Sequence, residues 1–102
     1  MVWSFGVNTS FKGNLFSETI LKGDQVISLS NYGRLGVEFE LAIEIGEDFG
    51  ANSNNLTVEK CMSKVSAVYP AFELIDDRNA DYPTVDLISQ TADNSWNANT
   101  VL

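Results

Sequence analysis

The sequence predicts a single α+β domain in which β-structure dominates, and three features lead to this expectation. Val37–Ile45 alternates apolar and polar residues, which is the period of a strand with two different faces. Val68–Ile75 is a second, mostly apolar run, and part of the segment between the two runs has helical spacing. A chain of 102 residues buries enough surface for one modest core but not for two, so residues 1–102 are expected to form one domain.

The first third of the chain is rich in turn residues and favours β-structure. Val2–Val7 has the composition of a short strand, and Val26–Leu29 predicts another. Lys22-Gly23-Asp24, just before the second of these strands, is typical of a turn.

The alternating strand Val37–Ile45 carries three glutamates on one face and contains no lysine or arginine. Glu38 and Glu40 are two residues apart, so their side chains share a face at a spacing of about 6.5–7 Å and can converge on one ion. The same pattern also arises when one face of an antiparallel strand is in water, and the pattern alone leaves both interpretations open. Glu44 lies on the same face and has no evident role.

A short amphipathic helix is expected after the polar loop that follows this strand. Thr57 is a plausible N-cap, and Glu59 lies in the first turn, where the helix dipole favours an anion. Apolar residues recur at helical spacing from Val58 to about Ser66. Cys61 falls on that apolar face, which favours a small core residue over a reactive thiol.

The apolar run Val68–Ile75 predicts a strand with two unusual residues. Pro70 cannot donate a hydrogen bond, so the strand begins after it or lies at a sheet edge there. Glu73 stands among apolar residues, where a charge needs a cation, a hydrogen-bond network or a raised pKa. Further on, Thr84–Gln90 predicts a helical turn.

The charge balance limits the partners and the chemistry. Fourteen acidic residues against six basic ones give a net charge of −8, which repels nucleic-acid phosphates and anionic membrane surfaces, so neither is an expected partner. The chain has no histidine, so a metal site must use oxygen ligands, which suit Mg²⁺, Mn²⁺ or Ca²⁺. The absence of histidine also excludes Ser-His and Cys-His nucleophiles.

Nothing in the sequence indicates export or membrane insertion. The single cysteine cannot form an internal disulfide, and no apolar run approaches membrane-spanning length. The N-terminus lacks the basic start and the long apolar core of a signal peptide. We therefore expect a cytoplasmic protein.

Three motifs occur in a fixed order: G-V-E-F-E-L-A-I-E-I-G at 36–46, Y-P-A-F-E-L-I-D-D-R at 69–78 and T-A-D-N-S at 91–95. Together they resemble the 2-keto-4-pentenoate hydratase group of the fumarylacetoacetate hydrolase superfamily. In that family an E-x-E on a strand is followed, a helix later, by P-A-apolar-E with an Asp and an Arg just beyond, and then by A-D-N. The resemblance covers residues 36–102 and leaves 1–35 as a divergent, β-rich segment. It implies part of the family's mixed β-roll, with one or two short helices.

Carried over residue by residue, the resemblance implies that Glu38, Glu40 and Glu73 match the ligands of a divalent metal ion, usually Mg²⁺ or Mn²⁺. Asp76 and Arg78 follow the third ligand as in the family, where they would organise the site, and they are the candidate catalytic residues. In family members the metal holds a 2-oxo acid through its keto and carboxylate oxygens and stabilises the enolate that forms.

The chain also departs from the family pattern. Family enzymes are generally more than twice this length. Gly13-Asn14-Leu15-Phe16 looks like a stretch of the hydratases, but the lysine and aspartate that handle protons before it have no counterpart here. We therefore expect a truncated, non-catalytic relative that keeps the metal site and acts as an oligomeric or binding module. The alternative is a metal-dependent hydratase or lyase acting on a 2-oxo (2-hydroxydienoic) acid, with its site completed by a second subunit.

Truncation of a β-roll has a structural consequence of its own. Half of such a roll leaves unpaired strand edges and an uncovered apolar face. Self-association removes both, so a homodimer or a larger closed oligomer is expected.

Overall fold

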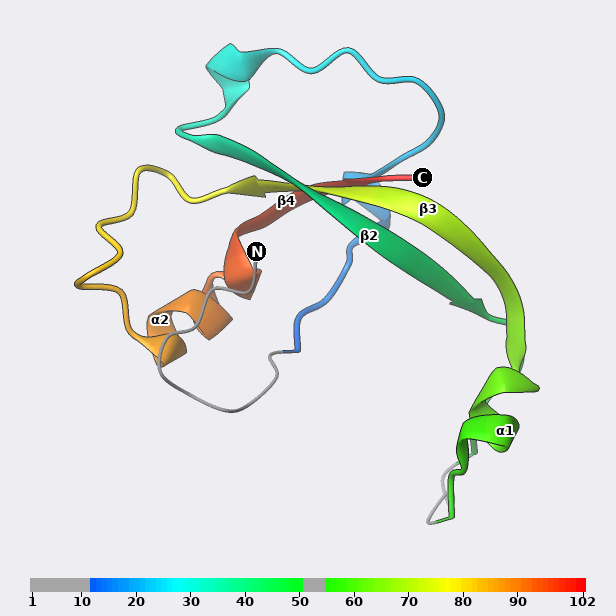
Figure 1. Ribbon diagram of the computed structural model, residues 1–102. Helices are drawn as coiled ribbons and strands as arrows, with labels where there is room; N and C mark the ends of the chain where they lie inside the picture. Colours follow the sequence, from blue (N-terminus) through cyan, green and yellow to red (C-terminus); the bar gives the residue numbers. More distant parts are fainter. Residues whose placement is uncertain (1–11, 51–54) are drawn as a thin grey trace.

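The computed structural model describes residues 12–50 and 55–102, which form a four-stranded mixed sheet in the order β1-β4-β3-β2 (Figure 1). The predicted α+β class with dominant β-structure is therefore confirmed. The elements are η1 (Ser17–Thr19), β1 (Ile20–Leu21), η2 (Leu29–Asn31), β2 (Leu35–Ile45), α1 (Val58–Met62), β3 (Val65–Asp76), α2 (Leu87–Ala92), η3 (Asn94–Trp96) and β4 (Asn97–Val101), where η marks a 3-10 turn.

Strands β2 and β3 form a long antiparallel hairpin, and both lie where the hydrophobic pattern predicted strands. They pair from Leu35 with Asp76 at one end to Ile45 with Val65 at the other. Strand β3 begins before Pro70, not after it, but β4 pairs with β3 only from Phe72 onwards. On the side of β4, Pro70 therefore lies at an edge of the sheet, a position that tolerates proline.

The strand predicted at Val26–Leu29 is wrong. Val26 is fully exposed and Leu29 begins the turn η2, and no strand of the sheet in the described residues pairs with this segment. The described strand in this part of the chain is instead the shorter β1, which pairs in parallel with β4. The sequence did not predict β4 as a strand. The segment Val2–Val7 lies outside the described residues.

Both helices are short. Helix α1 starts where expected, with the Thr57 hydroxyl accepting a hydrogen bond from the Lys60 N–H at 3.3 Å. It ends at Met62 instead of near Ser66, because the chain there enters β3. Cys61 is half-buried and is not part of the buried core. Helix α2 starts later than predicted, after Asp86, whose carboxylate caps it by accepting from the Ser89 N–H at 2.7 Å.

The core of the described fold is small. Its buried apolar side chains are Ala71, Leu74 and Trp96, and Trp96 stacks on Tyr82 with 5.5 Å between ring centroids. The chain exposes 7858 Å², compared with roughly 5,700 Å² expected for a folded monomer of this mass. Figure 1 shows why: the far end of the β2–β3 hairpin, with α1 at its tip, projects from the rest of the sheet. Within the described residues, no helix is long and apolar enough to cross a membrane.

Candidate metal centre and adjoining cavity

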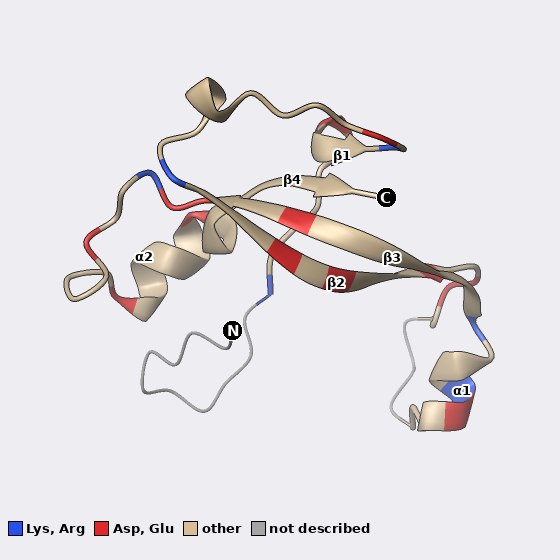
Figure 2. Cartoon of the chain, turned by 45° about the horizontal axis from the view of Figure 1, so that its top comes forward, with Lys and Arg blue, Asp and Glu red and all other residues tan. Residues whose placement is uncertain are grey.

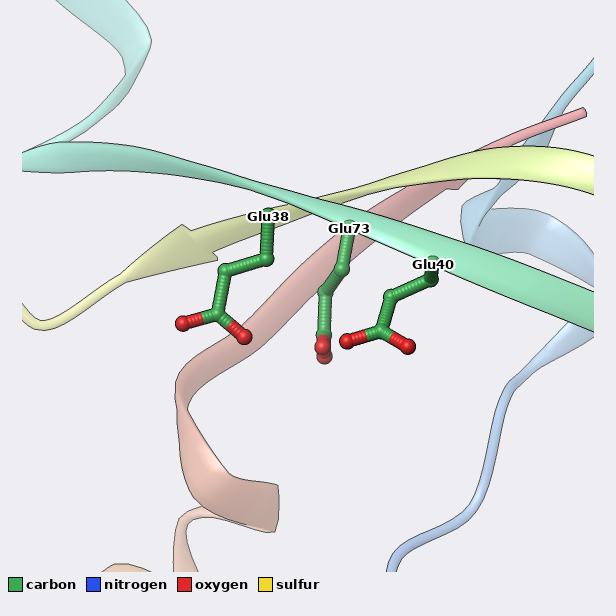
Figure 3. A group of neighbouring side chains, drawn as sticks. All are labelled: Glu38, Glu40 and Glu73. Atoms are coloured by element: carbon green, nitrogen blue, oxygen red, sulfur yellow. The ribbon is translucent and has the colours of Figure 1, made fainter. Parts of the chain in front are cut away.

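The three glutamates that the sequence singled out lie together. Glu38 on β2 stands directly opposite Glu73 on β3, and Glu40 follows two residues along β2 on the same face. One carboxylate oxygen from each lies within 4.8 Å of the other two (Figure 3). Glu38 and Glu73 are half-buried, whereas Glu40 is exposed.

The basic residues of the described chain do not neutralise this cluster. Figure 2 shows acidic segments side by side on β2 and β3, with no basic segment on that part of the hairpin. The ion pairs within the described residues lie elsewhere and join Arg34 to Asp77, Lys64 to Glu47, and Arg78 to Asp93. Like charges directly opposite on neighbouring strands destabilise a sheet, so the cluster favours the presence of a cation.

The Glu73 carboxylate is oriented by an amide. Asn97 Nδ2 donates a hydrogen bond to Glu73 Oε1 at 2.7 Å, from the first residue of β4. Such a bond from outside the ligand set fixes the direction of a metal-binding carboxylate. Asn97 follows closely after the A-D-N motif, but the sequence did not predict it as a site residue because it did not predict strand β4.

Glu44 does not belong to the cluster, as its lack of a role in the sequence analysis indicated. Its carboxylate accepts a hydrogen bond from the Tyr69 hydroxyl at 2.8 Å, farther along the hairpin. This hydrogen bond and the charge of Glu44 raise the pKa of Tyr69. The shared face of β2 therefore carries two cluster residues and one glutamate with a separate partner.

The donor set fits a hard divalent cation. Magnesium prefers carboxylate and water oxygens at about 2.0–2.1 Å, so two ligand oxygens on opposite sides of the ion lie about 4.2 Å apart. Neighbouring ligand oxygens of an octahedral ion lie only about 3 Å apart, so the three glutamate oxygens, which lie within 4.8 Å of one another, must move closer together to bind one ion. Neither thiol nor imidazole groups are present at the cluster, which disfavours zinc or copper.

A cavity of about 360 Å³ opens beside Glu73, within the size range of small-molecule sites. Its walls come from the 13–15 segment and from the chain around η3, so two distant parts of the sequence meet at the metal-ligand candidate. The described residues that line it are Gly13, Asn14, Leu15, Glu73, Asn94, Ser95 and Asn97.

One side chain joins the two walls of this cavity. Asn94 Oδ1 accepts from the Asn14 N–H and Asn94 Nδ2 donates to the Asn14 carbonyl, both at 2.9 Å, across a separation of 80 residues. A Cβ at position 13 would lie 2.2 Å from Asn94 Oδ1, so this approach requires Gly13. The structure thus brings together the Gly13-Asn14-Leu15-Phe16 stretch and the A-D-N motif that the resemblance named separately.

The turn that carries Asn94 has an unusual backbone. Asn94, Ser95 and Trp96 have φ values of 51°, 52° and 65°, a left-handed conformation that costs roughly 1–2 kcal/mol per non-glycine residue. Burial of the Trp96 side chain and its stacking on Tyr82 hold this turn in place. Strain of this kind is retained where the surrounding packing imposes it, and here it forms one wall of the cavity.

The two candidate catalytic residues, Asp76 and Arg78, do not line the cavity. Asp76 accepts from the backbone N–H groups of Gly33, Arg34 and Arg78, each at 3.0 Å at its nearest oxygen. The Arg34 N–H is the largest cause of the lowered pKa of Asp76. Arg78 pairs with Asp93 at the start of the left-handed turn. These contacts connect loops of the fold, and a catalytic role for either residue stays a prediction.

Asp77 is a buried charge that the sequence analysis did not identify. Arg34 Nε donates to its two oxygens at 2.8 and 2.6 Å, and the Tyr82 hydroxyl and the Asn79 N–H also donate to it. Burial opposes ionisation, but the Arg34 side chain, followed by these two donors, lowers the pKa of Asp77. Through Tyr82 this network reaches Trp96, so it supports the turn beside the cavity.

No family model matches the chain, and no curated protein matches it. Among solved structures, the fold is similar to 4-oxalocrotonate decarboxylase from Pseudomonas putida G7, determined in complex with magnesium and adipate. The TM-score is 0.79 at 22% sequence identity, and the match covers 94% of this chain. It covers 35% of the decarboxylase, so the chain spans about a third of that enzyme's length. The likeness establishes the fold, and it confirms the predicted α+β, mainly β architecture, which corresponds to part of the fold of that decarboxylase.

Proposed function

We propose that this protein binds Mg²⁺ or Mn²⁺ through Glu38, Glu40 and Glu73 and holds a small 2-oxo acid in the adjoining cavity, without turning it over. The observation that carries the proposal is the convergence of three carboxylates within 4.8 Å, with no ion pair to a basic residue of the described chain. A bound divalent cation would neutralise the cluster and offer a positive centre to the oxygens of an acid.

The cavity supports a small acid as the ligand. It opens beside Glu73, and the polar residues Asn94, Ser95 and Asn97 are among those that line it. Neutral donors of this kind can orient a carboxylate without binding it strongly in the absence of the ion. The structurally similar decarboxylase was determined with magnesium and adipate, a small dicarboxylate, which agrees with this ligand class.

The groups that line the cavity among the described residues support binding without turnover. Among the described residues that line it, Glu73 is the one ionisable side chain, and the proposal assigns Glu73 to the metal. A general acid or base contributes about 10²–10⁴ to the rate, so a site with neither is expected to bind and not to catalyse. We therefore favour the binding module over the hydratase or lyase completed by a second subunit.

Titration calorimetry tests the binding. Adipate and 2-oxoadipate are titrated into the protein in saturating Mg²⁺ and, separately, in EDTA. Binding is expected in Mg²⁺ only, to be lost in Glu40→Gln and kept in Glu44→Gln, which alters the same face outside the cluster. Equal affinity in EDTA, or unchanged binding in Glu40→Gln, would show that the cluster does not hold the ion for the acid.

A turnover assay separates the two functions. The ultraviolet absorbance of 2-hydroxypenta-2,4-dienoate is followed with added Mn²⁺, and it is expected to stay at the rate without protein. Protein-dependent loss of the dienoate that disappears in Glu40→Gln would replace the binding module with the enzyme.

A further inference from the structure

The β2–β3 hairpin has an apolar face on the side opposite the glutamates. Partners in an antiparallel register share a face, and here Phe39 stands opposite Phe72 and Ile43 opposite Val68. Phe39 and Phe72 touch, with ring centroids 5.2 Å apart, but both remain exposed to solvent. We call this surface the apolar arm face, formed by Val37 (52% exposed), Phe39 (83%), Leu41 (70%), Ile43 (58%), Val68 (52%) and Phe72 (42%).

The area of the apolar arm face is that of a dimer interface. Its exposed fractions correspond to roughly 500–900 Å², if each residue is given about 150–250 Å², the range for a large aromatic residue. Monomeric proteins rarely expose a continuous apolar patch of more than about 300–600 Å². A stable interface of standard size buries about 800 Å² on each partner, which this face nearly supplies by itself.

The charge distribution restricts how a second copy can cover this face. The chain carries a net charge of −8, so two copies repel each other over most orientations. The apolar arm face contains no ionisable side chain, and Glu38, Glu40 and Glu73 lie on the other face of the hairpin. Two copies that meet through this face therefore bury apolar area while their acidic faces point away from each other.

We propose that two copies pack their apolar arm faces together about a two-fold axis, with Phe39 and Leu41 near the centre. Such an isologous contact uses the same patch on both copies and closes at the dimer. Strand β2 is also one of the two outer strands of the described sheet, and edge-to-edge pairing through it is the competing arrangement. Edge pairing would leave the apolar arm face in water, whereas face packing covers it. The proposal does not depend on the metal site, and it places the two glutamate clusters on the outside of the dimer.

Sedimentation equilibrium in EDTA tests the proposal without the metal. Wild type is expected to be a dimer at micromolar concentration, and Leu41→Glu is expected to raise the dimer dissociation constant at least about thirty-fold. Ile88→Glu is the matched control, because Ile88 is similarly exposed at 79% but lies on α2, which packs against η3. Its dissociation constant should equal that of wild type. A wild-type monomer, folded or unfolded, or an unaffected Leu41→Glu dimer would overturn the proposal.

Disulfide cross-linking keeps the proposal testable if Leu41→Glu fails to fold. In a Cys61→Ser background, Leu41→Cys is expected to form a covalent dimer on mild oxidation, because the two positions meet across the axis. Glu40→Cys differs by one residue along the strand and points to the opposite face, so it should stay monomeric on a denaturing gel. Equal cross-linking of the two variants would indicate edge pairing and overturn face packing. Failure of Leu41→Cys to cross-link would also overturn face packing.

Discussion

Replacing Glu38 by glutamine should stabilise the protein without metal and destabilise it, relative to wild type, with metal. Glu38 lies within 4.8 Å of both other carboxylates of the cluster, so its charge contributes two like-charge repulsions in the apo protein. At that separation each pair costs about 0.9 kcal/mol in water, and more where solvent is partly excluded. The distance is shorter than the Debye length of about 8 Å at physiological salt, so screening reduces this cost only in part.

The expected gain of the Glu38→Gln variant in EDTA is about 1 kcal/mol in the free energy of unfolding. For a domain of this size that corresponds to a rise of about 4–8 °C in Tm. Wild type instead gains about 2.7 kcal/mol from Mg²⁺ at a hundred times its Kd, a gain that the variant loses with its ligand. Glu38→Gln should therefore have the higher free energy of unfolding in EDTA, and wild type should have the higher one in saturating Mg²⁺.

Urea and thermal unfolding of both proteins, in EDTA and across a Mg²⁺ series, measure this reversal. Glu44→Gln is the control, because Glu44 lies on the same face of β2 but bonds to Tyr69 outside the cluster, and it should keep the Mg²⁺ response of wild type. A Glu38→Gln variant that is less stable than wild type in EDTA would refute the repulsion argument. A variant that still gains the full Mg²⁺ stabilisation would refute the metal site.

Three further predictions concern the structure around the site. Gly13→Ala places a Cβ 2.2 Å from Asn94 Oδ1, so calorimetry should show weaker binding of the acid while the affinity for Mg²⁺ is retained. An unchanged affinity for the acid would mean that the hydrogen bonds between Asn94 and Asn14 do not shape the cavity. Trp96→Ala removes a buried side chain and should cost about 3–5 kcal/mol in urea unfolding, and a cost below about 1 kcal/mol would refute its role in holding the turn. The pKa of Asp76 is lowered in the folded state, chiefly by the Arg34 N–H. The stability that Asp76 contributes is therefore complete above its unfolded pKa of about 4 and is lost as pH falls through its folded pKa. Asp76→Asn should reduce the loss of unfolding free energy at acid pH, and an unchanged loss would contradict this assignment.

Local patterns explain why the two longest strands were predicted. Alternation along Val37–Ile45 is a property of successive residues, and it survives in β2 whatever the rest of the chain does. Strand β4 has no such pattern: Asn97–Val101 is mostly polar, and it becomes a strand because β3 and β1 both offer it backbone hydrogen bonds. Conversely, Val26–Leu29 has a strand-like composition, but no strand of the described sheet pairs with it.

The contacts that support the site likewise depend on residues that are distant in the sequence. The motif T-A-D-N-S contains Asn94, but nothing in it indicates a bridge to Asn14 across 80 residues. The network of Asp77 with Arg34 and Tyr82 was also invisible, because its members come from separate loops and carry no spacing of their own.

The sequence by itself determined that Glu38 and Glu40 share one face of a strand, since the pleat places residues two apart on the same side. It also determined that any metal here must be held by oxygen, since the chain has no histidine. Only the tertiary structure decided that Glu73 stands opposite Glu38 and that the opposite face of the hairpin is uncovered. Register and burial depend on which distant segments meet, and that is settled by the packing of the whole sheet and not by the order of residues within one strand.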